Sequence, residues 1–157
     1  MLLHETITKE VINAYYEVYN ELGFGFLENV YQNALFYELQ DRGFNVIPQK
    51  QMNVHFKERV VGSYFSDILV NDVVILELKA ASTLIKDHEL QLMNYLKATD
   101  IEVGLLLNFG KKPQFIRKVF SNENKKHYKE EEKEQEYLEW KIRENPRHPH
   151  NPRFNQS

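Results

Sequence analysis

Apolar side chains recur at helical spacing in three stretches of the chain. In residues 5–22 and 27–40 they fall three or four positions apart, which predicts two amphipathic helices. A glycine lies just past each stretch, as is common after a helix end. Residues 86–98 return to the same spacing, with Asp87 as the expected N-cap of a third helix.

The remaining patterned segments are typical of strands. Turn residues divide them at Lys57-Glu58-Arg59 and at Asn71-Asp72. The predicted strands cover residues 52–56, 60–70, 73–79, 101–109 and 114–120. The third is apolar on both faces, as expected of a central strand covered on both sides. The order α-α-β-β-β-α-β-β predicts an α/β protein with a mixed sheet.

Composition divides the chain at residue 121. Residues 1–121 are long enough for one folded domain, whereas residues 122–157 predict a charged helix followed by a disordered tail. The chain has no Cys, which excludes disulfides, Cys-ligated zinc and iron–sulfur clusters. Neither a signal peptide nor a membrane-spanning apolar run is recognisable, so a cytoplasmic protein without a membrane partner is expected.

Charge limits how the protein could bind phosphate. The net charge of −3 excludes a protein that is basic overall, so nucleic-acid binding would need a local patch. Lys111, Lys112, Arg117 and Lys118 form one basic stretch, for which a solvated strand edge is the commoner explanation. The histidines lack the spacing of a zinc site, and His55 is expected to face solvent.

Acidic and basic side chains interrupt two neighbouring predicted strands. Asp67 lies in the second strand, and Glu77 and Lys79 end the third, two residues apart and therefore on one face. A two-residue turn at Asn71-Asp72 would pair Asp67 with Leu76 and leave Glu77 on the other face. A three-residue turn, or a bulge, would pair Asp67 with Glu77.

Two carboxylates that meet on a half-buried face repel each other, and a divalent cation would resolve the conflict. Oxygen ligands favour Mg²⁺, which is typically held by one or two carboxylates. Lys79 would lie beside the metal and meet a phosphate. The alternative is a surface salt bridge at a strand end.

Three further residues are weaker candidates. Glu28 lies in the first turn of the second helix, where it is either a favourable charge for the helix dipole or a further ligand. Gln91 and Tyr95 are four residues apart on the third helix, with His88 nearby. They either form the polar edge of an amphipathic helix or orient Lys79, a carboxylate or a phosphate.

These pieces together resemble a known family. Residues 25–31, GFLENVY, match a G-x-x-E-x-x-Y signature, followed by Asp67, by Glu77-Leu78-Lys79, by Gln91-Leu92-Met93-Asn94-Tyr95 and by the segment GLLLNFG at 104–110. The chain resembles the GxxExxY protein family of the PD-(D/E)XK nuclease superfamily over about residues 5–120. Its Q-x-x-x-Y element also resembles the RecB-like branch of that superfamily. The chain departs from the superfamily motif at one position, where Ser66 rather than proline precedes Asp67.

The resemblance implies a restriction-endonuclease-like core whose metal site lies where the sheet opens. It implies metal binding by Asp67 and Glu77, with Glu28 and the Leu78 carbonyl as further ligands. It implies a catalytic role for Lys79, and for Gln91 and Tyr95 in the later helical motif.

The expected function is a Mg²⁺- or Mn²⁺-dependent nuclease acting on DNA. The alternative is a non-catalytic module that binds nucleic acid or a protein on the same fold. A glycosidase built on the two carboxylates is a third class, but a lysine beside the acids suits a phosphate better than a sugar.

Overall fold

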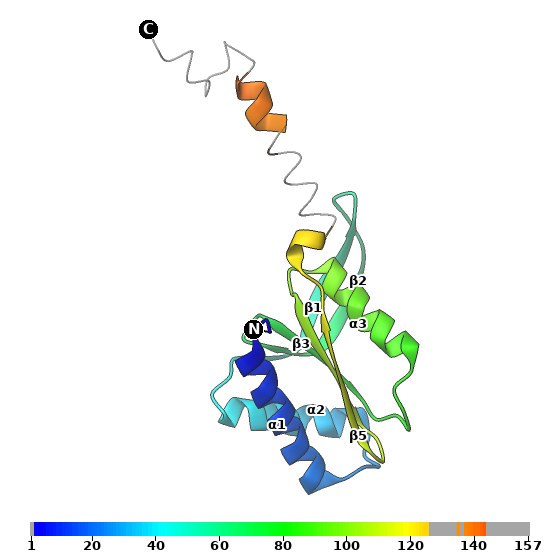
Figure 1. Cartoon of the computed structure of the whole chain (residues 1–157). Helices are drawn as coiled ribbons and strands as arrows, with labels where there is room; N and C mark the ends of the chain where they lie inside the picture. The colour runs from blue at the N-terminus through cyan, green and yellow to red at the C-terminus, as the bar shows by residue number, and fades with distance from the viewer. Residues whose placement is uncertain (1, 126–134, 136, 144–157) are drawn as a thin grey trace. The chain divides into compact units, whose positions relative to one another are not determined.

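The computed structural model describes residues 2–125, 135 and 137–143. Its helices and strands follow the predicted order along the chain (Figure 1). The chain divides into two compact units, Met1–Phe120 and Ser121–Ser157. In the second unit, Asn122–Asn124 form a short 3-10 helix and residues 137–143 are helical. The tail predicted to be disordered, residues 145–157, lies outside the described residues. Among the helices that are described, none is both long and apolar enough to cross a membrane.

Five strands of the first unit form one mixed sheet in the spatial order β1-β2-β3-β4-β5. The strands are β1 (Val46–Phe56), β2 (Arg59–Val70), β3 (Val74–Lys79), β4 (Val103–Phe109) and β5 (Pro113–Val119). Neighbours are antiparallel except β3 and β4, which are parallel and are connected through helix α3 (Lys86–Ala98). The predicted α/β class is confirmed.

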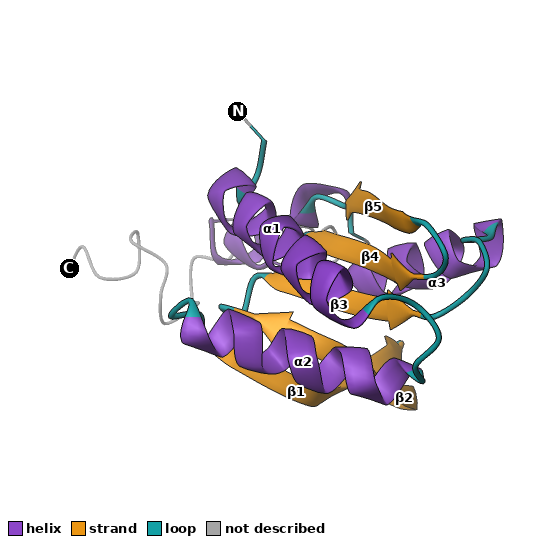
Figure 2. Cartoon of the chain, turned by 90° about the horizontal axis from the view of Figure 1, so that it is seen from below, coloured by secondary structure: helices purple, strands orange, loops and turns teal. Residues whose placement is uncertain are grey.

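Helices cover both faces of the sheet, which creates two cores (Figure 2). Helices α1 (Glu5–Leu22) and α2 (Glu28–Asp41) pack on one face, against side chains such as Leu76 and Leu78. Helix α3 packs on the other face, where Leu92 and Leu96 meet Ile75 and Leu106. Strands β3 and β4 lie between the two cores, and this explains their continuous apolar sequence.

One predicted boundary and one predicted helix cap are wrong. The first strand begins at Val46 rather than at residue 52, because Pro48 and the polar residues after it hid an edge strand, the position at which a sheet tolerates proline. Helix α3 begins at Lys86, so Asp87 lies within its first turn and is not the N-cap. The residue before the helix is Ile85, whose N–H donates to His88 Nδ1 at 3.3 Å.

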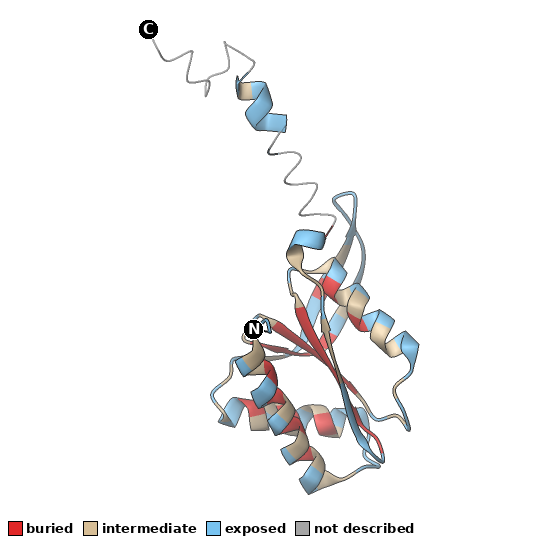
Figure 3. Ribbon diagram, in the orientation of Figure 1, coloured by how far each residue is buried: buried red, intermediate tan, exposed pale blue. Residues whose placement is uncertain are grey.

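Strands β1 and β2 extend well beyond the rest of the sheet. β2 pairs with β3 only from Ile68 to Val70, whereas its pairing with β1 continues to the turn at Lys57 and Glu58. Residues 50–66 therefore form a two-stranded hairpin, here called the β1–β2 arm, whose far end is exposed in Figure 3. His55, predicted to face solvent, is exposed on this arm.

Candidate functional site

The turn between β2 and β3 decides which side chains meet. Val70 pairs with Val74, so the turn has three residues, Asn71 to Val73, as the metal-site hypothesis required. Asn71 and Asp72 have φ values of 49° and 58°, a left-handed conformation that Asn and Asp tolerate better than most residues. This register places Asp67 opposite Glu77.

The two carboxyl groups lie where the ladder between β2 and β3 ends, at Ile68 and Leu76. Beyond it, Asp67 Oδ2 accepts a hydrogen bond from the Leu78 N–H at 2.7 Å. Each carboxyl group also alters the pKa of the other. The Asp67 side chain therefore holds the two strands together at the point where the sheet opens.

Burial makes this pair electrostatically unfavourable when both groups are charged. Loss of solvation, and then the neighbouring Asp67 charge, raises the pKa of Glu77 from 4.5 to about 9. Burial also raises the pKa of Asp67. Glu77 Oε1 is buried without a hydrogen-bond partner among the described residues. An unpartnered buried carboxylate oxygen is costly, and a cation would satisfy it.

Lys79 shares the site from the end of β3. It lies two residues after Glu77 and therefore on the same face of the strand, and its charge lowers the pKa of Asp67 and of Glu77 as a minor contribution. It forms no salt bridge within 4.0 Å in the described part of the chain. The structure therefore brings Asp67, Glu77 and Lys79 together at one end of the sheet.

A buried amide holds the chain just after Lys79. Asn108 of β4 is 1% exposed and pairs with Lys79 in the parallel ladder. Its Oδ1 accepts from the Ala81 N–H at 3.0 Å, and its Nδ2 donates to the Ala81 carbonyl at 2.9 Å. Gly110 is required beside it, because a Cβ there would lie 2.2 Å from that carbonyl oxygen. Sequence reasoning missed Asn108, whose signal is a lone amide in an apolar strand.

Helix α3 brings Gln91 and Tyr95 to the same region. Gln91 Nε2 donates to Tyr95 Oη at 2.6 Å. The Tyr95 ring stacks on Tyr64 of β2, with centroids 3.5 Å apart and planes at 8°. Burial, and then the Glu77 charge, raises the pKa of Tyr95. Gln91 and Tyr95 also line an open concavity of about 530 Å³ along α3.

The G-x-x-E-x-x-Y stretch builds the loop that leads into α2. Gly25 has a φ of 108°, which favours glycine. Tyr31 donates its hydroxyl to the Gly23 carbonyl at 2.6 Å and accepts from the Phe26 N–H at 3.2 Å. Its ring stacks on Phe109, with centroids 4.3 Å apart. The Gly and Tyr of the signature thus fix the backbone immediately before Glu28.

Glu28 itself is the first residue of α2 and is exposed. Its charge raises the pKa of Asp67, so it lies on the Asp67 side of the site. Within the described residues, no three His, Cys, Asp or Glu side chains converge on one point for a metal ion. Glu28 therefore does not join Asp67 and Glu77 in a ready-made three-acid cluster.

Two glutamines that sequence reasoning missed line the same side. Gln32, one helical turn after Glu28, donates its Nε2 to the Asp67 carbonyl at 3.1 Å. Its Oε1 accepts from Gln49 Nε2 at 3.0 Å, and Gln49 lies in β1 with a φ of 51°. The four-residue spacing from Glu28 was the available signal.

The four residues of the predicted basic stretch have different surroundings in the structure. Lys118 forms a salt bridge with Glu89 of α3 at 2.9 Å, and Arg117 Nη2 donates to the Leu3 carbonyl. Lys111 and Lys112 are exposed in the turn between β4 and β5. Of the four basic residues, Lys111 and Lys112 are thus the better placed for an external phosphate.

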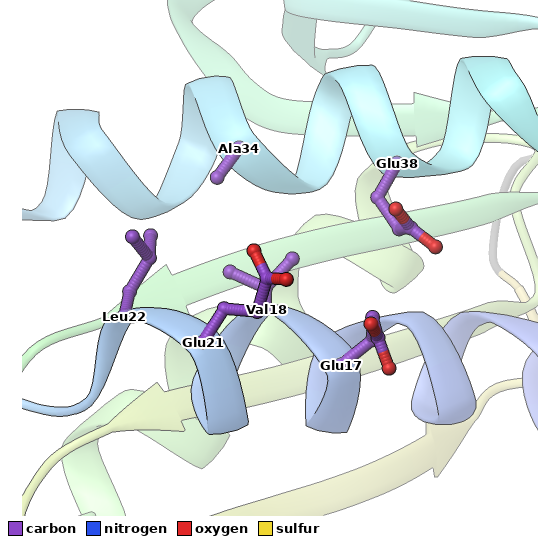
Figure 4. A pocket seen from close by; sticks show the side chains of 6 residues that line it. All are labelled: Glu17, Val18, Glu21, Leu22, Ala34 and Glu38. Atoms are coloured by element: carbon purple, nitrogen blue, oxygen red, sulfur yellow. The ribbon is translucent and has the colours of Figure 1, made fainter.

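A separate small pocket lies between α1 and α2 (Figure 4). It is lined by Glu17, Val18, Glu21, Leu22, Ala34 and Glu38. None of these residues belongs to the site described above, and Glu38 is already paired with Arg42 at 2.9 Å.

Comparison with known protein families identifies the class of protein. The model of the PD-(D/E)XK nuclease superfamily matches residues 5–119, and the chain belongs to that superfamily. Nucleases of this superfamily generally use divalent metal ions. No curated protein matches the sequence. The crystal structure of SSO0001 is similar at 15% identity with a TM-score of 0.47, and the similarity covers 75% of this chain and 60% of that one.

Proposed function

We propose that this protein is a metal-dependent nuclease that hydrolyses DNA phosphodiester bonds. The observation that carries the proposal is the pairing of Asp67 with Glu77 at the opening of the sheet, with Glu77 Oε1 buried and, among the described residues, unpartnered. We assign the chain to the GxxExxY group and the RecB-like branch on the motifs around Glu28 and Gln91.

The residues fit Mg²⁺ or Mn²⁺ as a two-carboxylate site. Asp67 and Glu77 would hold the ion, with Glu28 as an outer ligand that its exposed position leaves free to move. A strand residue directs its N–H and its carbonyl to the same side. Because the Leu78 N–H meets Asp67, the Leu78 carbonyl is directed to the same opening. Bound there, a divalent ion supplies Lewis-acid activation of the phosphate and a lowered pKa for the attacking water.

The chain's own residues supply position and charge. The Asn108 amide fixes the backbone two residues after Lys79. The Lys79 ammonium would bind the phosphate and balance the charge that builds up during hydrolysis. Tyr95 is oriented by Gln91 and by the Tyr64 ring. It would position the substrate or Lys79.

The test is cleavage of labelled DNA with Mg²⁺ or Mn²⁺. Wild type is compared with Asp67→Asn and Lys79→Ala, and the exposed residues Asp41→Asn and Lys9→Ala provide matched controls. We expect cleavage by wild type and both controls, and loss in the two site variants. Equal activity in all five proteins would indicate a contaminating enzyme and contradict the proposal. Metal-independent DNA binding without cleavage would favour the non-catalytic module.

A further inference from the structure

The β1–β2 arm exposes apolar side chains that the sheet does not cover. Phe56, Val60, Val61 and Phe65 are 56–62% exposed on the hairpin. Phe65 pairs with Gln51, five residues from Phe56 on β1, so the two rings lie on opposite faces of the hairpin. Hairpins gain little stability alone, and grouped exposed apolar residues are typical of an interaction site. The arm therefore presents a surface for a partner.

The charge of the arm indicates the chemistry of that partner. Residues 50–65 contain three basic residues, Lys50, Lys57 and Arg59, against the single acid Glu58, in a chain whose net charge is −3. None of the three basic residues forms a salt bridge in the described part of the protein. Lys57 Nζ lies 5.4 Å from the centre of the Phe56 ring, so cation and aromatic face occur together. Aromatic rings beside cations suit bases and phosphates.

The arm leads directly into the candidate site. Phe65 precedes Asp67 by two residues on β2, which corresponds to about 7 Å of extended strand. The residue before it, Tyr64, faces the other way and stacks on Tyr95 of α3. Because Phe65 and Asp67 share a face of β2, a nucleotide stacked on Phe65 would bring a phosphate to the carboxyl pair.

We propose that the β1–β2 arm binds a single-stranded segment of nucleic acid, with a base stacked on Phe65 beside the site and phosphates held by Lys57 and Arg59 at the turn. The assignment rests on the proposed nuclease function and specifies its substrate. Unpaired bases can stack on exposed rings, whereas bases within a duplex are already stacked on one another. A second copy of the chain fits less well, since a two-fold contact through this surface would bring like charges together.

The test measures binding without catalysis. Fluorescence anisotropy of a labelled oligothymidylate about 15 nucleotides long, within the range of single-strand site sizes, is recorded in EDTA for wild type, Phe65→Leu and Phe65→Tyr. We expect Phe65→Leu to weaken binding about tenfold, because it keeps apolar area but removes the ring, and Phe65→Tyr to bind as wild type. Tyr37→Ala on α2, where the ring is 63% exposed, is the matched control and should bind normally.

Salt dependence tests the phosphate contacts. The double variant Lys57→Ala/Arg59→Ala should lower the slope of log affinity against log salt by about 1.4, or about 0.7 for each lost contact on a single strand. Lys9→Ala on α1 should leave the slope unchanged. A duplex of the same length should bind at least about tenfold more weakly than the single strand, because its bases cannot stack on Phe65.

Several results would overturn the assignment. These are equal affinity of Phe65→Leu and wild type, equal affinity for duplex and single strand, or a wild-type dimer in light scattering that Phe65→Leu converts to a monomer while oligonucleotide binding persists. The nuclease proposal is tested separately. If wild type cleaves DNA and the arm variants bind normally, only the proposal for the arm is refuted. If binding depends on the arm but no cleavage occurs, only the nuclease proposal is refuted.

Discussion

The end of β3 and the β1–β2 arm both adjoin Asp67, yet they differ in how their backbones are held. Around β3, Leu76 and Leu78 are at most 1% exposed, and Asn108 fixes the chain that follows. On the arm, by contrast, the strand pair loses its third strand and exposes rings such as Phe65. Strand β3 is covered by side chains on both faces, whereas each strand of the arm is paired along one edge only.

This difference separates two tasks. A group that acts on a reacting atom must keep its position within a fraction of an ångström, so it belongs on the buried strand. A surface that holds a variable chain of nucleotides tolerates movement, so it belongs on the arm. Changes at β3 should therefore alter the rate of the chemical step, whereas changes on the arm should alter affinity.

The largest expected effect is on rate. Lys79→Ala should lower kcat for DNA cleavage by about 10²–10³-fold, because it removes the charge that meets the phosphate. Phe65→Leu should instead raise KM with little change in kcat. Steady-state cleavage assays measure both, and a kcat loss for Phe65→Leu as large as that for Lys79→Ala would break the division between the two regions.

The next effect is on stability as a function of pH. The pKa of Glu77 in the folded protein, about 9, exceeds its value of 4.5 outside the fold, so the folded protein keeps a proton that the unfolded chain loses. The contribution of Glu77 to the stability of the metal-free protein should therefore be greatest below pH 4.5 and should fall as pH rises toward 9. A difference of one in pKa between the folded and unfolded chain corresponds to about 1.4 kcal/mol of stability. Asp67 contributes in the same direction.

Glu77→Gln removes the ionisable group and should flatten this decline. Urea unfolding in EDTA under mildly acidic and mildly alkaline conditions measures it, with the exposed Glu17→Gln as a control that should follow wild type. If the stability of Glu77→Gln fell with pH as steeply as that of wild type, Glu77 would not be the group responsible.

A smaller effect is expected where the end of β3 is braced. Asn108→Ala leaves the N–H and carbonyl of Ala81 without their partners and should cost about 2–3 kcal/mol of unfolding free energy. Because these two hydrogen bonds fix the backbone two residues after Lys79, kcat should fall more than KM rises. Asn33→Ala, exposed on α2, should change neither quantity. Stability loss without any change in kcat would limit Asn108 to a structural role.

The smallest effect concerns the loop before Glu28. Tyr31→Phe keeps the ring stacked on Phe109 but removes the hydroxyl that binds Gly23 and Phe26, at a cost of about 1 kcal/mol. Thermal unfolding measures it, and the exposed Tyr37→Phe should unfold as wild type does. A cost equal to that of Tyr31→Ala would mean that the ring contributes nothing.

Sequence periodicity was sufficient for the element order, because long apolar repeats dominate α1, α2 and β4. The metal-site hypothesis required a three-residue turn at Asn71 to Val73, because that register places Asp67 opposite Glu77, and the structure has this turn. Periodicity could not reveal the early part of β1, where pairing with β2 outweighs an unfavourable local sequence at Pro48. Nor could it find Asn108, whose partners lie 27 residues away in the chain.

The most direct test of the carboxyl pair is calorimetric titration with Mn²⁺ or Mg²⁺ near neutral pH in two buffers of different ionisation enthalpy. We predict one ion per chain and the release of close to one proton, because Glu77 holds a proton that the metal must displace. Asp67→Asn and Glu77→Gln should each weaken binding at least about tenfold. Binding of the same ion with unchanged affinity in both variants would contradict the account.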